Sequence, residues 1–77
     1  MAPPPSDIEH AVSAIRTYLQ LHPRGADTPE GVAQWWLGSS FSLAIIAAAL
    51  EQLLASGEVE RTNIGQRQLW RRSRQEN

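Results

Sequence analysis

The stretch that most constrains the fold lies in the second half of the chain, where an apolar segment ends at a glycine and two short polar segments follow. Residues 43–55 carry apolar side chains at helical spacing, and Gly57 just after them is typical of the end of a helix. Residues 58–72 are expected to form two short strands around a turn at 63–65, because asparagine and glycine there tolerate positive φ. This order predicts a helix followed by a β-hairpin.

Two further helices are expected before this segment. The first covers about residues 7–21, because Ser6 and Glu9 have the spacing of a capping box and apolar residues recur with a helical period after them. The second is short and ends near Gly38. It begins at Thr28, a favourable N-cap that is followed by proline and glutamate.

The third helix is expected to follow the caps Ser39 and Ser40 and to reach Ser56. Its spacing predicts an inward face made of Leu43, Ile46, Ala47, Leu50, Leu53 and Leu54. The outward face then holds Ser42, Ile45, Ala48, Ala49 and Gln52. The predicted core of the whole domain consists of Val12, Ile15, Leu19, Leu43, Ile46, Leu50, Leu53, Val59 and Leu69.

The length and the ends of the chain bound its organisation. With 77 residues we expect one domain over residues 6–72, preceded by a disordered proline-rich lead at 1–5 and followed by a flexible tail at 73–77. The first residues lack the pattern of a secretion signal, and the apolar run at 43–50 is too short to span a membrane. We therefore expect a cytoplasmic protein without a membrane partner.

Charge is divided unevenly between the two parts of the chain. Residues 1–56 contain two arginines and five carboxylates, whereas residues 57–77 contain five arginines and three carboxylates. Such asymmetry is typical of an interaction surface. The net charge of −1 nevertheless falls short of the basicity of a free-standing nucleic-acid binder.

The predicted order of elements, with the sequences GEVER at 57–61 and QRQLWR at 66–71, resembles the winged helix-turn-helix domains of bacterial regulators. In that group a G-x-V-x-R strand follows the third helix, and a strand with an aromatic residue closes the wing. The resemblance spans residues 6–72 and implies a mainly α fold with a small β-hairpin, a three-helix winged helix-turn-helix. This architecture serves both DNA binding and protein interaction.

DNA binding is the alternative function. The third helix carries no basic residue, and the polar groups that it and its start offer to bases are Ser39, Ser40, Ser42 and Gln52. The predicted wing is better suited to phosphate contacts, through Arg61, Arg67, Arg71 and Arg72. A competing interpretation is that these arginines form an ordinary solvated surface interleaved with Glu58 and Glu60.

Protein interaction is the function we expect. Ile45 and Ala48 would form an exposed apolar strip, so that Ile45→Glu should abolish association and leave the helices intact. Trp35 and Trp36 are neighbours whose directions on a helix differ by roughly 100°, so both indoles can hardly enter one core. We expect one inside and the other available to a partner, either another protein or a second copy; the alternative is that both are half-buried.

Catalysis finds no support in the sequence. There is no cysteine, and the only histidines, His10 and His22, lack companions at the spacing of metal ligands. The glycines are scattered and form no phosphate-binding loop, and most of the serines lie at predicted helix caps. We therefore expect a non-enzymatic module with no cofactor, no metal and no small-molecule substrate.

Overall fold

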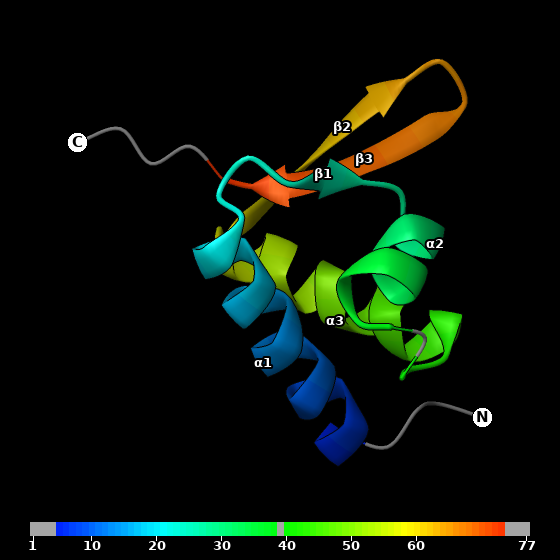
Figure 1. Cartoon of the computed structure of the whole chain (residues 1–77). Coiled ribbons are helices and arrows are strands. Elements are labelled where there is room, and N and C mark those ends of the chain that lie inside the picture. Colours follow the sequence, from blue (N-terminus) through cyan, green and yellow to red (C-terminus); the bar gives the residue numbers. More distant parts are fainter. Residues whose placement is uncertain (1–4, 39, 74–77) are drawn as a thin grey trace.

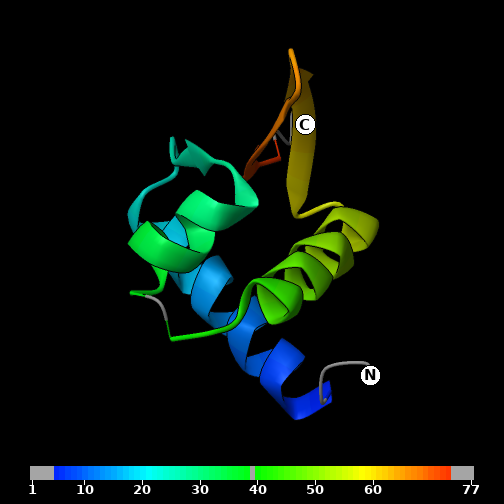
Figure 2. The same cartoon turned by 90° about the vertical axis from the view of Figure 1, so that its right-hand side faces the viewer.

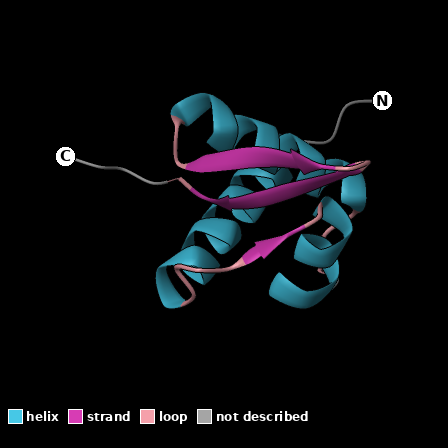
Figure 3. Ribbon diagram, turned by 90° about the horizontal axis from the view of Figure 1, so that it is seen from above, coloured by secondary structure: helices cyan, strands magenta, loops and turns pink. Residues whose placement is uncertain are grey.

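The structure is a computed structural model that describes residues 5–38 and 40–73. Its elements follow one another as α1 (Pro5–Leu21), β1 (Ala26–Asp27), α2 (Pro29–Gly31), the π-helical turn η1 (Val32–Trp36), α3 (Leu43–Ser56), β2 (Val59–Ile64) and β3 (Arg67–Arg72). The helices form one layer, and the sheet lies across one end of it (Figures 1 and 3). The chain is thus a mixed domain of three helices, with α2 and η1 continuous, and a small antiparallel sheet.

The sheet contains three strands among the described residues, in the order β1-β3-β2. β2 and β3 form the predicted hairpin, which pairs Val59 with Arg72 at its base and Ile64 with Arg67 beside the turn. β1 adds two residues to the other edge of β3, opposite Arg71 and Trp70. The sequence analysis missed β1, because a two-residue strand owes its conformation to pairing with a distant segment.

The helix ends are set by local hydrogen bonds. The Thr28 hydroxyl accepts from the Gly31 backbone N–H at 3.2 Å, as predicted for an N-cap. Ser42, and not Ser40, caps α3 by accepting from the Ile45 N–H at 3.3 Å, while the predicted cap Ser39 lies outside the described residues. Gly57 ends α3 with φ of 82°, which confirms its predicted role.

The two ends of the domain differ in detail from the prediction. α1 already begins at Pro5, so Ser6 and Glu9 lie inside the helix and the predicted capping box is wrong. The predicted lead at 1–5 and tail at 73–77 fall mostly outside the described residues. Ser73, the first residue of that tail, donates its backbone N–H to the Glu58 carbonyl at 3.0 Å.

The core lies between α1, α3 and the base of the hairpin. Six predicted members are confirmed as buried, namely Ile15, Leu19, Ile46, Leu50, Leu53 and Val59. Four further residues join them: Ala11, Val32, Ala49 and Trp70. The prediction was wrong for Leu43, which is 47 % exposed, and for Ala47, which is exposed; Val12 and Leu54 are half-buried against the core.

The orientation of β3 is the reverse of the prediction, because Trp70 is buried and Leu69 is only half-buried. A three-residue turn at 63–65 would place Leu69 opposite the buried Val59. The turn instead consists of residues 65–66, with Gly65 at φ of 61°, so Val59 faces Arg72 and the next inward position of β3 is Trp70. Since side chains alternate along a strand, this change in register exchanges the two faces.

Within the described ranges, no helix combines the length and the apolar character needed to cross a bilayer.

Candidate interaction surface

The π-helical turn η1 separates the two neighbouring tryptophans. Its wide loop closes with a hydrogen bond from the Leu37 N–H to the Val32 carbonyl at 3.2 Å, five residues back. Trp36 packs against the core, whereas 72 % of Trp35 is exposed. Trp35 is therefore the outer of the two indoles, whereas Trp36 is half-buried and not fully inside the core. Single π-turns of this kind often occur at functional sites.

Trp36 is held in place by stacking. Its ring lies 4.5 Å from the Tyr18 ring, centroid to centroid, with an angle of 9° between the planes. His22 lies 4.5 Å from Tyr18 in a tilted arrangement. A side chain at Gly25 would crowd this stack, since its Cβ would come within 3.2 Å of the Tyr18 ring. The segment next to the exposed indole is thus firmly anchored to α1.

A shallow apolar groove of about 550 Å³ runs beside this stack, between α1 and residues 36–37 and 40–41. Its principal apolar walls are Ala14, Tyr18, Leu21, Trp36, Leu37 and Phe41. No carboxylate, lysine or arginine lines it, so the groove suits an apolar partner surface. Sequence analysis missed this groove, because Leu37 and Phe41 approach α1 only through the tertiary fold.

The predicted outward strip of α3 is largely covered. Ser42 and Gln52 of this predicted face are exposed. Ala49 is fully buried, so its predicted outward position was wrong, and Ile45 and Ala48 are half-buried, with Ile45 packed against the core. The reason is that α3 packs against α2 and η1 as well as α1. Val32 of η1 is fully buried in the same core.

The arginines of the hairpin fall into two groups. Arg61 forms an ion pair with Glu51 at 3.2 Å and lies 5.5 Å from the centroid of the Trp70 ring, and Arg71 pairs with Glu60 at 2.7 Å. The positive charges of Arg61 and Arg71 are therefore neutralised by carboxylates of the same domain. Arg67 and Arg72 are exposed and have no carboxylate partner in the described part of the chain.

The polar residues predicted for base contacts are dispersed. Ser42 uses its hydroxyl as the cap of α3, while Ser40 is exposed beside the apolar groove. Gln52 is exposed more than two turns further along the same helix. The structure brings no donor or acceptor cluster together from these three side chains.

Sequence reasoning also missed a contact between α1 and the start of β2. The Arg16 guanidinium donates to both carboxylate oxygens of Glu58, at 2.7 and 2.9 Å, and the Ser56 hydroxyl donates to the same group at 2.8 Å. The hydrogen bonds from Arg16 and Ser56 lower the pKa of Glu58, and its partner raises the pKa of Arg16. The contact joins residues 42 positions apart in the sequence, which explains why no local sequence pattern predicted it.

The described residues contain no group of three or more histidine, aspartate or glutamate side chains placed to hold a metal ion. No protein-family model, curated protein or solved structure matches the chain.

Proposed function

We propose that this chain is a non-enzymatic winged-helix domain that binds another protein, or a second copy of itself, through Trp35. The exposure of Trp35 carries this proposal. The winged-helix assignment is supported by the order of three helices followed by a hairpin, with a short strand before the second helix on the far edge of the sheet.

The free energy available at Trp35 favours a contact. A tryptophan contributes about 150–250 Å² of surface, so burying the exposed part of this indole is worth roughly 3 kcal/mol at about 25 cal/mol per Å². Tryptophan is also among the residues that most often dominate binding energy in interfaces. Because stacking fixes the adjacent Trp36, the contact would cost little additional ordering of the backbone.

The apolar groove supports the same surface. Trp36 and Leu37, which follow Trp35 directly, line it. The contact surface we propose therefore consists of Trp35 and this groove, and it replaces the strip of Ile45 and Ala48 expected from helical spacing alone.

Trp35→Glu tests the proposal, with Ile64→Glu as its matched control. Both side chains are large, apolar and exposed, at 72 % and 57 %, but Ile64 lies at the tip of the hairpin. Sedimentation equilibrium measures self-association, and immobilised chain measures partners retained from extract of the source cells. We expect Trp35→Glu to lose association and Ile64→Glu to keep it; equal behaviour of the two variants would refute the proposal.

DNA binding through the hairpin is the second candidate. The hairpin extends beyond the helices (Figure 2), and residues 61–68 are all exposed. Arg67 near its tip is available to a phosphate, whereas Arg61 and Arg71 are engaged by Glu51 and Glu60.

Binding to random duplex DNA at low and moderate salt tests this candidate. Arg67→Ala should weaken binding to all DNA sequences alike. It should also reduce the slope of log affinity against log salt concentration by about one, the value of a single lost phosphate contact. Arg24→Ala, at an exposed arginine remote in sequence from the hairpin, is the control. A loss confined to one DNA sequence, or wild-type binding that does not respond to salt, would contradict phosphate contact by the wing.

A further inference from the structure

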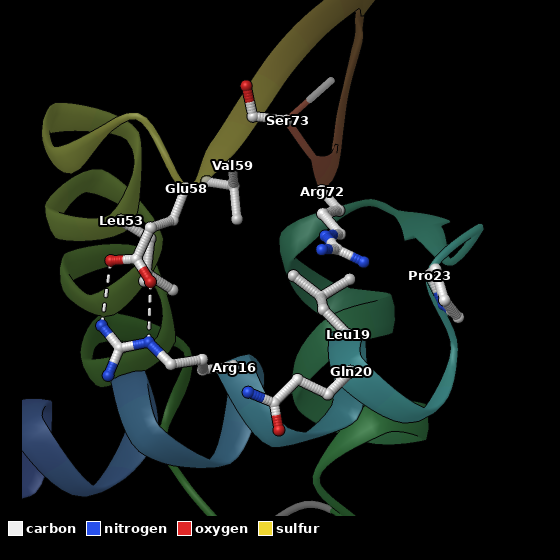
Figure 4. Close-up of a pocket in the computed structure, with 9 residues that line it drawn as sticks. All are labelled: Arg16, Leu19, Gln20, Pro23, Leu53, Glu58, Val59, Arg72 and Ser73. Atoms are coloured by element: carbon white, nitrogen blue, oxygen red, sulfur yellow. Dashed lines mark hydrogen bonds and ion pairs between the residues drawn. The ribbon is translucent and has the colours of Figure 1, made fainter. Parts of the chain in front are cut away.

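A second pocket lies where the last turns of α1 meet the end of α3 and the base of the hairpin (Figure 4). It has a volume of about 470 Å³, within the usual range for sites that bind small molecules. It shares no lining residue with the apolar groove beside Trp36. A ligand here would therefore be independent of the proposed protein contact.

The inner wall of the pocket is apolar and rigid. Leu19, Leu53 and Val59 line it, and all three belong to the buried core. Each is only 2–4 % exposed, so neighbouring elements fix the position of this wall and only a small part of each side chain is open to the pocket.

The rim of the pocket is unbalanced toward positive charge. Both oxygens of Glu58 are occupied by Arg16, and Ser56 donates a further hydrogen bond to one of them, so this carboxylate is not free to neutralise a second cation. Arg72 lies opposite Val59 on β3, and its guanidinium is directed toward Leu19 (Figure 4). Among the described residues it has no ion pair. Gln20 also lines the pocket.

We propose that this pocket binds a small carboxylic acid, with its carboxylate on Arg72 and its apolar body against Leu19, Leu53 and Val59. The planar fork of a guanidinium matches the two oxygens of a carboxylate, which makes arginine the side chain best suited to this group. The same chemistry occurs in a free apolar acid and at the carboxyl end of a protein chain that finishes in an apolar residue.

Amide NMR spectra recorded during titration test the proposal with phenylacetate as the probe. We expect saturable shifts at Leu19, Gln20, Val59 and Ser73. Acetate lacks the apolar body and phenylacetamide lacks the charge, so each should bind at least tenfold more weakly. N-acetylphenylalanine distinguishes the two sources: tenfold tighter binding than phenylacetate assigns the site to a chain end, and weaker binding assigns it to a free acid.

Arg72→Gln should weaken phenylacetate binding at least tenfold, whereas Arg67→Gln, on the same strand, should leave it unchanged. Trp35→Glu should also leave phenylacetate binding unchanged. The protein-contact proposal and the ligand proposal can therefore fail independently of each other. Equal binding by wild type and Arg72→Gln, equal binding of phenylacetate and phenylacetamide, or shifts that do not saturate would overturn the proposal. The comparison of the probes uses the wild type alone and does not depend on the folding of any variant.

Discussion

The outer face of α3 and the turn η1 both carry apolar residues that helical spacing predicts to be exposed, yet the fold treats them differently. Ile45 on α3 is half-buried against the core, while Trp35 on η1 is left 72 % exposed. α3 packs against α1 and also against α2 and η1, so its buried apolar residues extend beyond a single stripe of the helix. η1 lies at the periphery and can anchor only one of its two indoles.

The difference shows what spacing can and cannot decide. A helical period identifies which residues share a face, but the number of neighbours that cover the helix decides how many faces are buried. In this domain α1, α2 and η1 all contact α3, so residues beyond a single stripe of this helix are covered. An exposed tryptophan on a peripheral turn is therefore a stronger indication of function than an apolar residue on the central helix.

The largest effect on stability is expected for Ile45→Glu. We now expect this variant to lose roughly 2–4 kcal/mol of unfolding free energy, because it removes half-buried apolar surface and places a charge against the core. A domain of this length has about 4–12 kcal/mol in total. Chemical denaturation measures the loss. A variant as stable as the wild type would show that Ile45 is exposed, as helical spacing alone predicts, and not packed against the core.

The two tryptophans give a smaller effect with an internal control. Trp36→Ala should cost roughly 2 kcal/mol, because it removes the stack on Tyr18 and part of the packing against the core. Trp35→Ala should change the free energy of unfolding by less than about 0.5 kcal/mol. Thermal unfolding of the pair checks this, and comparable losses in both variants would mean that Trp35 is packed in solution.

The Arg16–Glu58 pair should give the smallest effect. Both side chains are more than a third exposed, so solvent screening keeps its contribution below about 1 kcal/mol. Because folding lowers the pKa of Glu58, the contribution is present above the ordinary pKa near 4.5 and is lost as the pH falls through the lowered value.

The stability difference between wild type and Glu58→Gln, measured by urea denaturation from pH 7 downward, should shrink over this range. Glu9→Gln, at an exposed glutamate outside any ion pair of the described residues, is the control. A difference that stays constant below pH 4 would show that the charge of Glu58 is not responsible.

Much of the fold could be predicted because its signals are local. Thr28 caps the second helix, Gly57 ends α3, and a glycine near residue 65 supplies the hairpin turn. Each depends on a residue type and its immediate neighbours. Six of the nine predicted core residues are buried for a similar reason, since their helical or strand period alone selects them.

The rest depends on contacts that are distant in sequence. β1 forms only against β3, and the burial of Trp70 follows from a turn of two residues instead of three. The pairing of Arg16 with Glu58 and the groove that α1 forms with residues 36–37 and 40–41 also join separate segments. For the candidate site, sequence identified the pair of tryptophans, but the fold was needed to show which indole is exposed.

The most direct test of the proposed function compares wild type, Trp35→Glu and Ile64→Glu as immobilised chains, offered both the soluble wild-type chain and extract of the source cells. The exposed indole of η1 predicts that wild type and Ile64→Glu retain the same protein and that Trp35→Glu loses it, with the helical circular dichroism of all three unchanged. Retention of that protein by Trp35→Glu at the wild-type level, or no retention by the wild type, would contradict the assignment of Trp35 to a protein contact.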